Sequence, residues 1–145
     1  MSRRVLIVLV AAVIVAIAGW QLAMRVFMAA PDDLDLSLSK KSATGLYAVS
    51  LTPEQAPIRE GVLQSFLLTV KTADGKPADV LRIEIAGGMP RHGHGLPTEP
   101  HVTAALGDGK HRIEGFKFTM SGWWQLRFTI DAPPGRDEAD FNIVL

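Results

Sequence analysis

The chain has 145 residues, with 15 lysines and arginines, 15 aspartates and glutamates, and a formal net charge of zero. This balance gives no electrostatic basis for binding nucleic acid, which usually requires a basic domain. Cysteine is absent, which excludes disulfide bonds and thiolate chemistry, and the length allows one ordinary domain plus an appendage.

The appendage is an apolar segment near the N-terminus, Val5 to Met24, that contains no charged residue. A helix of this length, at about 1.5 Å per residue, spans a hydrocarbon core of about 30 Å. Arg3 and Arg4 precede the segment, and positive charge on that side favours a cytoplasmic N-terminus. Trp20 lies near the far end, where an aromatic ring suits the membrane–water interface. We therefore expect a single-pass membrane helix, with the rest of the chain outside the cytoplasm.

A cleaved signal peptide is the alternative for this segment. The apolar core of a signal peptide covers only about 7–15 residues and ends at a small-x-small site. Here the apolar run is longer, and Met28-Ala29-Ala30 puts a bulky residue at the first position of such a site. We favour a retained signal-anchor over residues 1–30, followed by a polar linker over 31–43 and one domain over 44–145.

Beyond Leu46, apolar residues recur at every second position, which is the pattern of half-buried β-strands. The alternating sets are Tyr47, Val49 and Leu51; Val62, Phe66, Leu68 and Val70, with Gln64 as the exception; Leu81, Ile83 and Ile85; Phe116, Phe118 and Met120; Trp124, Leu126, Phe128 and Ile130; and Phe141, Ile143 and Leu145. Turn-forming residues separate these runs: Asp74-Gly75, Gly87-Gly88, Asp108-Gly109 and Pro133-Pro134-Gly135. About seven short strands at this spacing predict an all-β fold, an immunoglobulin-like antiparallel β-sandwich preceded by one N-terminal transmembrane helix.

The stretch Met89-Pro-Arg-His92-Gly-His94-Gly95 places a thioether and two imidazoles within six residues. Its prolines and glycines predict a shaped loop. In an extended segment, His92 and His94 would point to the same side, because side chains alternate along a strand. Methionine sulfur and neutral histidine nitrogen together suit copper, above all Cu(I), where thiolates are absent. The stretch therefore predicts a copper site.

Further donors follow the loop in the sequence. Met120 lies just before Ser121-Gly122, and a sandwich brings loops of distant strands together at its ends. The expected metal ligands are therefore Met89, His92, His94 and Met120. His101 and His111 are weaker candidates, and zinc is the competing metal, although thioether ligation argues against it.

The same residues also fit a structural role. Each histidine of the loop can donate to a backbone carbonyl and brace an irregular segment. Met89 and Met120, taken singly, are typical core fillers. In this alternative the domain is a non-metal interaction module of the cell envelope that docks an envelope protein.

Enzyme signatures are missing from the sequence. There is no GxSxG elbow, no cysteine nucleophile and no HExxH motif, so we expect no catalytic activity. Asp137, Glu138 and Asp140 form an acidic cluster, which we interpret as a solvated turn leading into the last strand.

The segment from about Thr44 to Leu145 resembles the YtkA-like domain, which is related to the FixH-type accessory proteins of oxidase assembly. The resemblance is carried by the Met89–Gly95 stretch, by Pro97 and Pro100, by Gly107-Asp108-Gly109, by the block from Phe118 to Trp124 and by Asp140-Phe141. It implies a sandwich domain outside a bacterial cytoplasmic membrane, either anchored or secreted. For some members it suggests copper trafficking or respiratory oxidase assembly. The chain departs from FixH-type proteins in having a single apolar segment.

Taken together, these observations predict a single-pass protein of the bacterial cytoplasmic membrane, with a cytoplasmic N-terminus and a periplasmic or extracellular domain. We expect it to be an accessory protein that binds copper through the Met/His loop, in metal handling or oxidase assembly. Its expected partners are the membrane, through the helix, and an envelope protein, but no nucleic acid.

Overall fold

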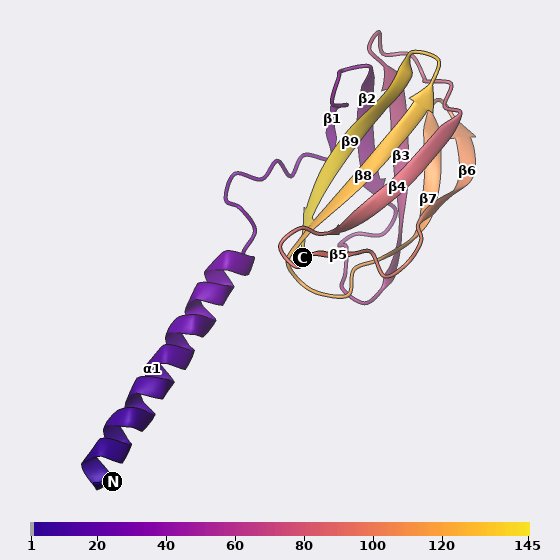
Figure 1. Cartoon of the computed structure of the whole chain (residues 1–145). Helices are drawn as coiled ribbons and strands as arrows, with labels where there is room; N and C mark the ends of the chain where they lie inside the picture. The colour runs from indigo at the N-terminus through magenta and orange to yellow at the C-terminus, as the bar shows by residue number, and fades with distance from the viewer. Residues whose placement is uncertain (1) are drawn as a thin grey trace.

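A computed structural model describes residues 2–145 and consists of one long helix joined to an antiparallel β-sandwich (Figure 1). The helix, α1, covers Arg3–Met28, and its part from Arg3 to Met24 is long and apolar enough to cross a membrane. Its apolar side chains from Val5 to Leu22 are exposed. A segment without regular structure connects α1 to the first strand.

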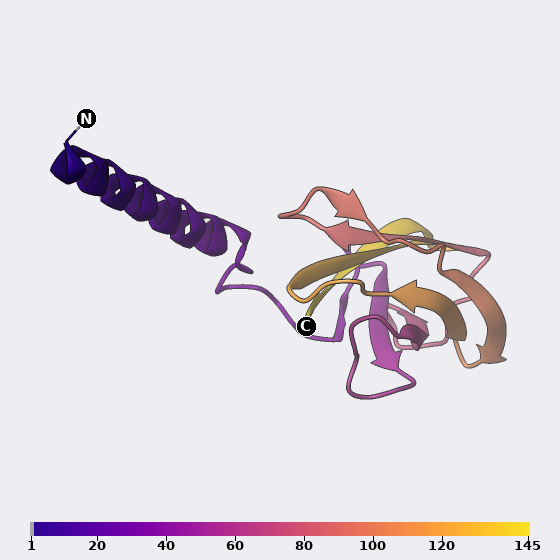
Figure 2. The ribbon, with the colours of Figure 1, turned by 90° about the horizontal axis from the view of Figure 1, so that it is seen from below.

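The sandwich consists of two antiparallel sheets that lie face to face as two layers (Figure 2). The strands are β1 (Ser39–Lys41), β2 (Tyr47–Pro53), β3 (Leu63–Thr72), β4 (Arg82–Met89), β5 (His94–Gly95), β6 (His101–Gly107), β7 (Lys110–Lys117), β8 (Trp123–Ala132) and β9 (Gly135–Val144). One sheet has the strand order β1-β2-β3-β7-β6, and the other has β5-β4-β8-β9. Seven of the described strands have seven residues or more, whereas β1 and β5 have three and two. The predicted all-β sandwich with an N-terminal apolar helix is confirmed.

The core lies between the two sheets and takes one face of each long strand, because side chains alternate along a strand. Its largest fully buried members are Tyr47, Phe66, Phe116, Phe118, Trp124, Phe128 and Phe141. Several of these rings meet edge to face, for example Phe66 with Phe116 at a centroid distance of 5.0 Å.

One detail of the sequence pattern agrees with the structure, and two differ from it. Gln64, expected as an exception on the inner face of β3, does lie on that face and is buried. Val62 lies before the strand and is 45% exposed, because Gly61, at φ +76°, turns the chain just ahead of β3. Gly87-Gly88, expected as a turn, belongs to β4.

The acidic cluster is also not a solvated turn, so that interpretation was wrong. Asp137 lies within β9, is only 4% exposed, and accepts hydrogen bonds from the backbone N–H groups of Thr44 and Leu46 and from the Thr44 hydroxyl. The carboxylate therefore holds the turn between β1 and β2 against β9. Glu138 and Asp140 face outward on the same strand, beside Arg127.

The two ends of the sandwich carry different loops. At one end lie the turns 42–46, 73–81, 108–109 and 133–134. At the other end lie the loops 54–62, 90–93 and 118–122, which we call the Met/His end. β4 and β7 finish at this end, and β3 and β8 begin there.

Candidate functional site

The predicted Met/His loop is a tight turn between β4 and β5. Met89 is the last residue of β4, and its carbonyl accepts hydrogen bonds from the backbone N–H groups of His92 and Gly93, both at 3.0 Å. Gly93 adopts a φ of +70°, which glycine reaches at little cost. The chain therefore reverses at once, and His94 pairs with Met89 across the hairpin.

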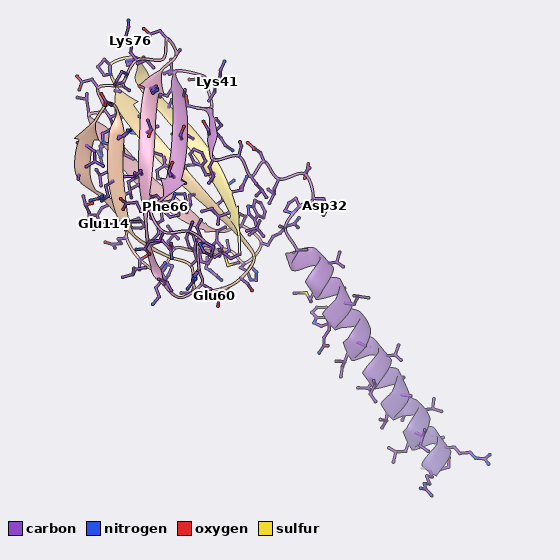
Figure 3. The ribbon with its side chains drawn as sticks, turned by 180° about the vertical axis from the view of Figure 1, so that it is seen from behind. Asp32, Lys41, Glu60, Phe66, Lys76 and Glu114 are labelled. Carbon is purple, nitrogen blue, oxygen red and sulfur yellow. The ribbon has the colours of Figure 1, made fainter. Side chains whose placement is uncertain are left out.

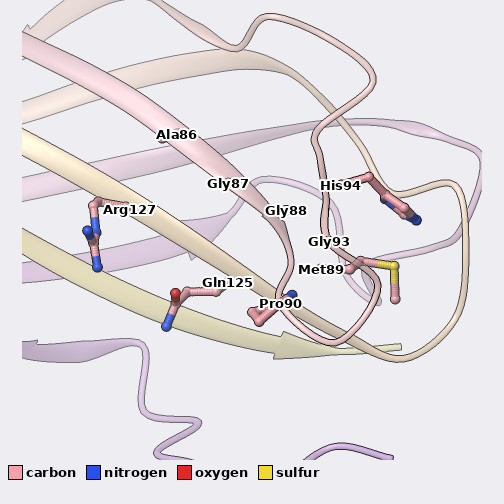
Figure 4. A pocket seen from close by; sticks show the side chains of 9 residues that line it. All are labelled: Ala86, Gly87, Gly88, Met89, Pro90, Gly93, His94, Gln125 and Arg127. Atoms are coloured by element: carbon pink, nitrogen blue, oxygen red, sulfur yellow. The ribbon is translucent and has the colours of Figure 1, made fainter. Parts of the chain in front are cut away.

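The turn places His94 on the same face of the sheet as Met89, because directly paired residues of antiparallel strands point to the same side. Figure 4 shows the two side chains extending together from the hairpin. Residues 92 and 93 belong to the turn and not to an extended segment, so the alternation we expected between His92 and His94 does not apply. Their ring centroids nevertheless lie 5.7 Å apart, with the ring planes inclined by 43°.

Neither imidazole is used to brace the turn. Within residues 2–145, the rings of His92 and His94 make no hydrogen bond, and both side chains are exposed. The turn is instead held by the backbone hydrogen bonds to the Met89 carbonyl and by the pairing of β4 with β5. Both rings are thus available as ligands.

Met89 pairs with His94 across the hairpin and is only 1% exposed. Its terminal methyl group packs against the loop that follows β7, because a Cβ added to Gly122 would lie 3.2 Å from Met89 Cε. Gly122, at φ +118°, therefore lets the loop pass close over the thioether.

Met120 lies in this same loop, two residues before Gly122, and is half-buried against the core. Trp124 donates its indole N–H to the Met120 carbonyl at 3.0 Å, and the Trp124 ring meets Phe118 edge to face at 5.3 Å. Gly122 and Leu145 exchange two backbone hydrogen bonds, of 2.9 and 3.1 Å. The structure thus brings the Met120 segment against Met89 and fixes it there.

The other two histidines lie elsewhere. His101 begins β6, with its Nδ1 3.1 Å from the Glu99 carbonyl, and His111 lies in β7. Both line a cavity of about 320 Å³ between β4 and β6, which does not include the turn. Burial lowers the pKa of His111 below its ordinary value. These two residues are therefore not part of the Met/His site.

Sequence reasoning missed several residues that shape the site. Gly87, Gly88, Gln125 and Arg127 line a concave surface of about 370 Å³ together with His94 (Figure 4). A Cβ at Gly88 would collide with the His94 carbonyl oxygen, so glycine is required where β5 crosses close to β4. The adjacent glycines were the signal for this close approach, but in the sequence they resemble a turn.

The donor set of the site is restricted. The described residues contain no group of three or more His, Cys, Asp and Glu side chains arranged to hold a metal ion. At the turn, the two imidazoles are exposed donors and the Met89 thioether is a buried one, with Met120 in the adjoining loop. Such a set fits Cu(I) better than zinc, which prefers thiolate, imidazole and carboxylate ligands.

The fold and this turn define a class of protein: a small β-sandwich domain behind an apolar helix, with an exposed histidine pair and a buried methionine at one end. The model of the YtkA-like family matches residues 40–129, and the chain belongs to that family. No curated protein and no solved structure matches the chain. The relation to FixH-type proteins stays a prediction.

Proposed function

We propose that this protein is a membrane-anchored accessory protein that binds Cu(I) outside the cytoplasm, through His92, His94 and Met89, with Met120 as a further ligand. The observation that carries the proposal is the hairpin itself. It places two unpartnered imidazoles side by side, with a thioether on the same face of the sheet.

Access to the sulfur is the main chemical requirement. Because Met89 is almost fully buried, a metal ion reaches its sulfur only after the groups that cover it, such as the 120–122 loop, shift. Methionine suits such a rearrangement, since its side chain is unbranched and adapts readily. We therefore expect the two histidines to capture the ion first and the thioether to complete the site.

The anchor is the second part of the proposal. α1 is taken as a retained helix that crosses the bacterial cytoplasmic membrane once, with Arg3 and Arg4 on the cytoplasmic side. The domain then lies on the outer side of that membrane, and its histidine and methionine donors bind copper without a cysteine thiolate. Metal handling, or the assembly of a respiratory oxidase, are the processes that such a site would serve.

The experiment is an anaerobic Cu(I) titration of the full chain in detergent against a chromogenic chelator. We expect one ion per chain, and its loss when His92→Ala and His94→Ala are combined. Met89→Leu keeps the core volume but removes the sulfur, and should weaken Cu(I) binding by roughly tenfold or more, about 1.4 kcal/mol. His101→Ala, at the other cavity, is the matched control and should leave affinity unchanged.

The copper proposal would be refuted if the native chain retained no Cu(I), or if the double histidine substitution left Cu(I) retention unchanged. In that case the second candidate becomes preferable: an interaction module of the envelope in which the hairpin is structural. Its specific support is the burial of Met89 within the core, as expected of a packing residue.

A further inference from the structure

The segment between α1 and the sandwich is attached to the domain near the Met/His end. The side-chain amide of Asn142 donates to the carbonyl of Asp35 at 3.0 Å, and Lys40 bonds the Asp35 carboxylate at 2.6 Å. A backbone hydrogen bond of 2.8 Å joins Leu51 N–H to the Leu38 carbonyl. Among the described residues, Asp35 is therefore the first point of the tether that is bonded to the domain, and residues 29–34 connect it to α1.

Asn142 lies close to one end of β9. Asn142 is three residue steps, about 10 Å of strand, from Leu145. Leu145 forms backbone hydrogen bonds with Gly122, which contacts Met89. Seven residues, about 23 Å, separate Asn142 from Gly135 at the opposite end. The tether therefore joins the sandwich much nearer to the Met/His end.

The short tether limits how the domain can stand on a membrane. From Met28 to Asp35 there are seven residue steps, which reach at most about 25 Å when fully extended. With the opposite end against the bilayer, Asp35 would stand about 23 Å above it, and the tether would be stretched almost completely. With the Met/His end against the bilayer, about 10 Å suffices, and most of the tether stays slack.

The Met/His end also carries exposed apolar and basic side chains. Val62 is 45% exposed and Leu63 is 60% exposed, where β3 begins beside the end of β7. Half-buried Lys117 pairs with Leu63 in register, and Arg59 is exposed next to Glu60 in the neighbouring loop. Figure 3 shows Glu60 of this loop at the lower end of the sandwich, nearer to α1, and Lys76 at the opposite end. Apolar side chains next to basic ones suit the interface of an anionic bilayer.

We propose that the Met/His end rests on the bilayer surface, with Val62 and Leu63 in the headgroup layer and Arg59 and Lys117 beside lipid phosphates. The candidate copper ligands then lie within the membrane-proximal layer. Exchange of metal with membrane-embedded partners is favoured by this position. The inference rests on the membrane-anchoring part of the proposed function and does not depend on metal binding.

The test uses the full chain, without added metal, in vesicles of phosphatidylcholine and phosphatidylglycerol that contain a headgroup-quencher lipid. Because the chain has no cysteine, a single fluorophore is introduced at Gln55→Cys, in the loop at the Met/His end, or at Ala73→Cys, in a turn at the opposite end. Both positions are exposed and uncharged, so the two variants are matched. We expect quenching to be several-fold stronger at position 55.

Contact with lipid is separated from mere proximity by a second pair of variants. Val62→Glu with Leu63→Glu should reduce quenching at position 55 to near the level at position 73. Arg59→Gln with Lys117→Gln should reduce it only in vesicles containing phosphatidylglycerol. Equal quenching at positions 55 and 73, or quenching at 55 that survives the glutamate substitutions, overturns the proposal.

The two proposals fail in distinguishable ways. Loss of vesicle binding by the labelled chain in a flotation assay refutes the anchor. A chelator titration in which the chain takes up no Cu(I) refutes the copper site. Such a titration leaves the comparison of positions 55 and 73 unchanged, whereas loss of vesicle binding overturns the orientation together with the anchor.

Discussion

Asp137 is the clearest case of a single residue that organises one end of the sandwich. Burial by itself raises the pKa of this carboxyl group, but hydrogen bonds from Ser42, Thr44 and the Glu138 backbone outweigh it and lower the pKa to about 2. The folded state therefore favours the ionised form. The stabilisation is fully present above the ordinary pKa near 3.8 and is lost as the pH falls through about 2.

Replacing Asp137 by Asn is expected to destabilise the domain by about 2 kcal/mol at pH 7, because the new amide group faces backbone donors. The wild-type chain should lose stability between about pH 4 and pH 2, whereas the variant should lose much less over that interval. Thermal denaturation followed by near-ultraviolet circular dichroism measures both effects. Asp140→Asn, which removes a surface pair with Arg127 on the same strand, is the control and should cost at most about 1 kcal/mol. Equal losses for the two variants would contradict the capping role of Asp137.

The histidines of the turn allow the opposite prediction, that their removal changes nothing in the metal-free protein. Because neither ring makes a hydrogen bond within residues 2–145 and both are exposed, His92→Ala combined with His94→Ala should shift stability by no more than about 0.5 kcal/mol. The same thermal measurement, in chelator-treated buffer, checks this. A clear fall in melting temperature without metal would favour the structural interpretation of the loop over the copper site.

At the scale of elements, the close spacing of β4 and β5 depends on one of two glycines that pair across the hairpin. Gly88 and Gly95 face each other in register, but a Cβ at Gly88 would strike the His94 carbonyl, whereas a Cβ at Gly95 would lie at an ordinary 3.4 Å from the Gly87 carbonyl. The two positions therefore form a matched pair for substitution. Only one of them has room for a methyl group.

Gly88→Ala is expected to separate β5 from β4 and to cost about 1–3 kcal/mol, whereas Gly95→Ala should be nearly neutral. Hydrogen exchange of the Leu96 amide, which donates to the Gly87 carbonyl at 3.0 Å, reports directly on the hairpin. Its protection should fall in Gly88→Ala and persist in Gly95→Ala. Comparable protection in both variants would show that β4 and β5 tolerate a wider spacing.

These elements also show what sequence can and cannot predict. The period-two pattern of β8, with Trp124, Leu126 and Phe128 inward, is a local property and specifies its strand without knowledge of the partner. Gly87-Gly88 is different, because its glycines are required by a neighbouring strand and not by a turn. Asp137 is bonded to Thr44, 93 residues away, so nothing near it in the sequence indicates burial. Patterns internal to a strand were predictable, whereas roles set by distant partners were not.

The same distinction holds for the candidate site. Its residue types, methionine and histidine within six positions, are visible in the sequence. Their common face follows from the tight turn at Gly93 and from the pairing of Met89 with His94. The contact of Met89 with Gly122 depends on how the loop after β7 crosses the end of the sandwich. This last contact is tertiary, which is why the sequence leaves open whether Met89 is a core residue or a ligand.

At the scale of the whole molecule, α1 and the sandwich are expected to behave independently. The helix exposes its apolar side chains from Val5 to Leu22, and the domain has its own core, so membrane attachment and folding should be separable. Near the middle of a membrane-spanning helix, each lysine costs about 2.5–3.5 kcal/mol on insertion scales, while valine and isoleucine favour insertion slightly. Two adjacent lysines therefore offset most of the free energy that favours insertion of the helix into the bilayer.

Val13→Lys combined with Ile14→Lys is expected to move the full chain out of the membrane fraction, while the near-ultraviolet signal of the buried Trp124 stays native. Flotation with vesicles and resistance to alkaline extraction measure the first effect. Leu36→Lys, at a 53% exposed position in the tether beyond the helix, is the control and should leave attachment unchanged. Persistent attachment of the double variant would mean that the lipid contacts of Val62 and Leu63 hold the domain on the membrane without the helix. Because two partly exposed apolar side chains contribute only a few kcal/mol at most, release is the expected outcome, and the helix is then the anchor while the Met/His end only orients the domain.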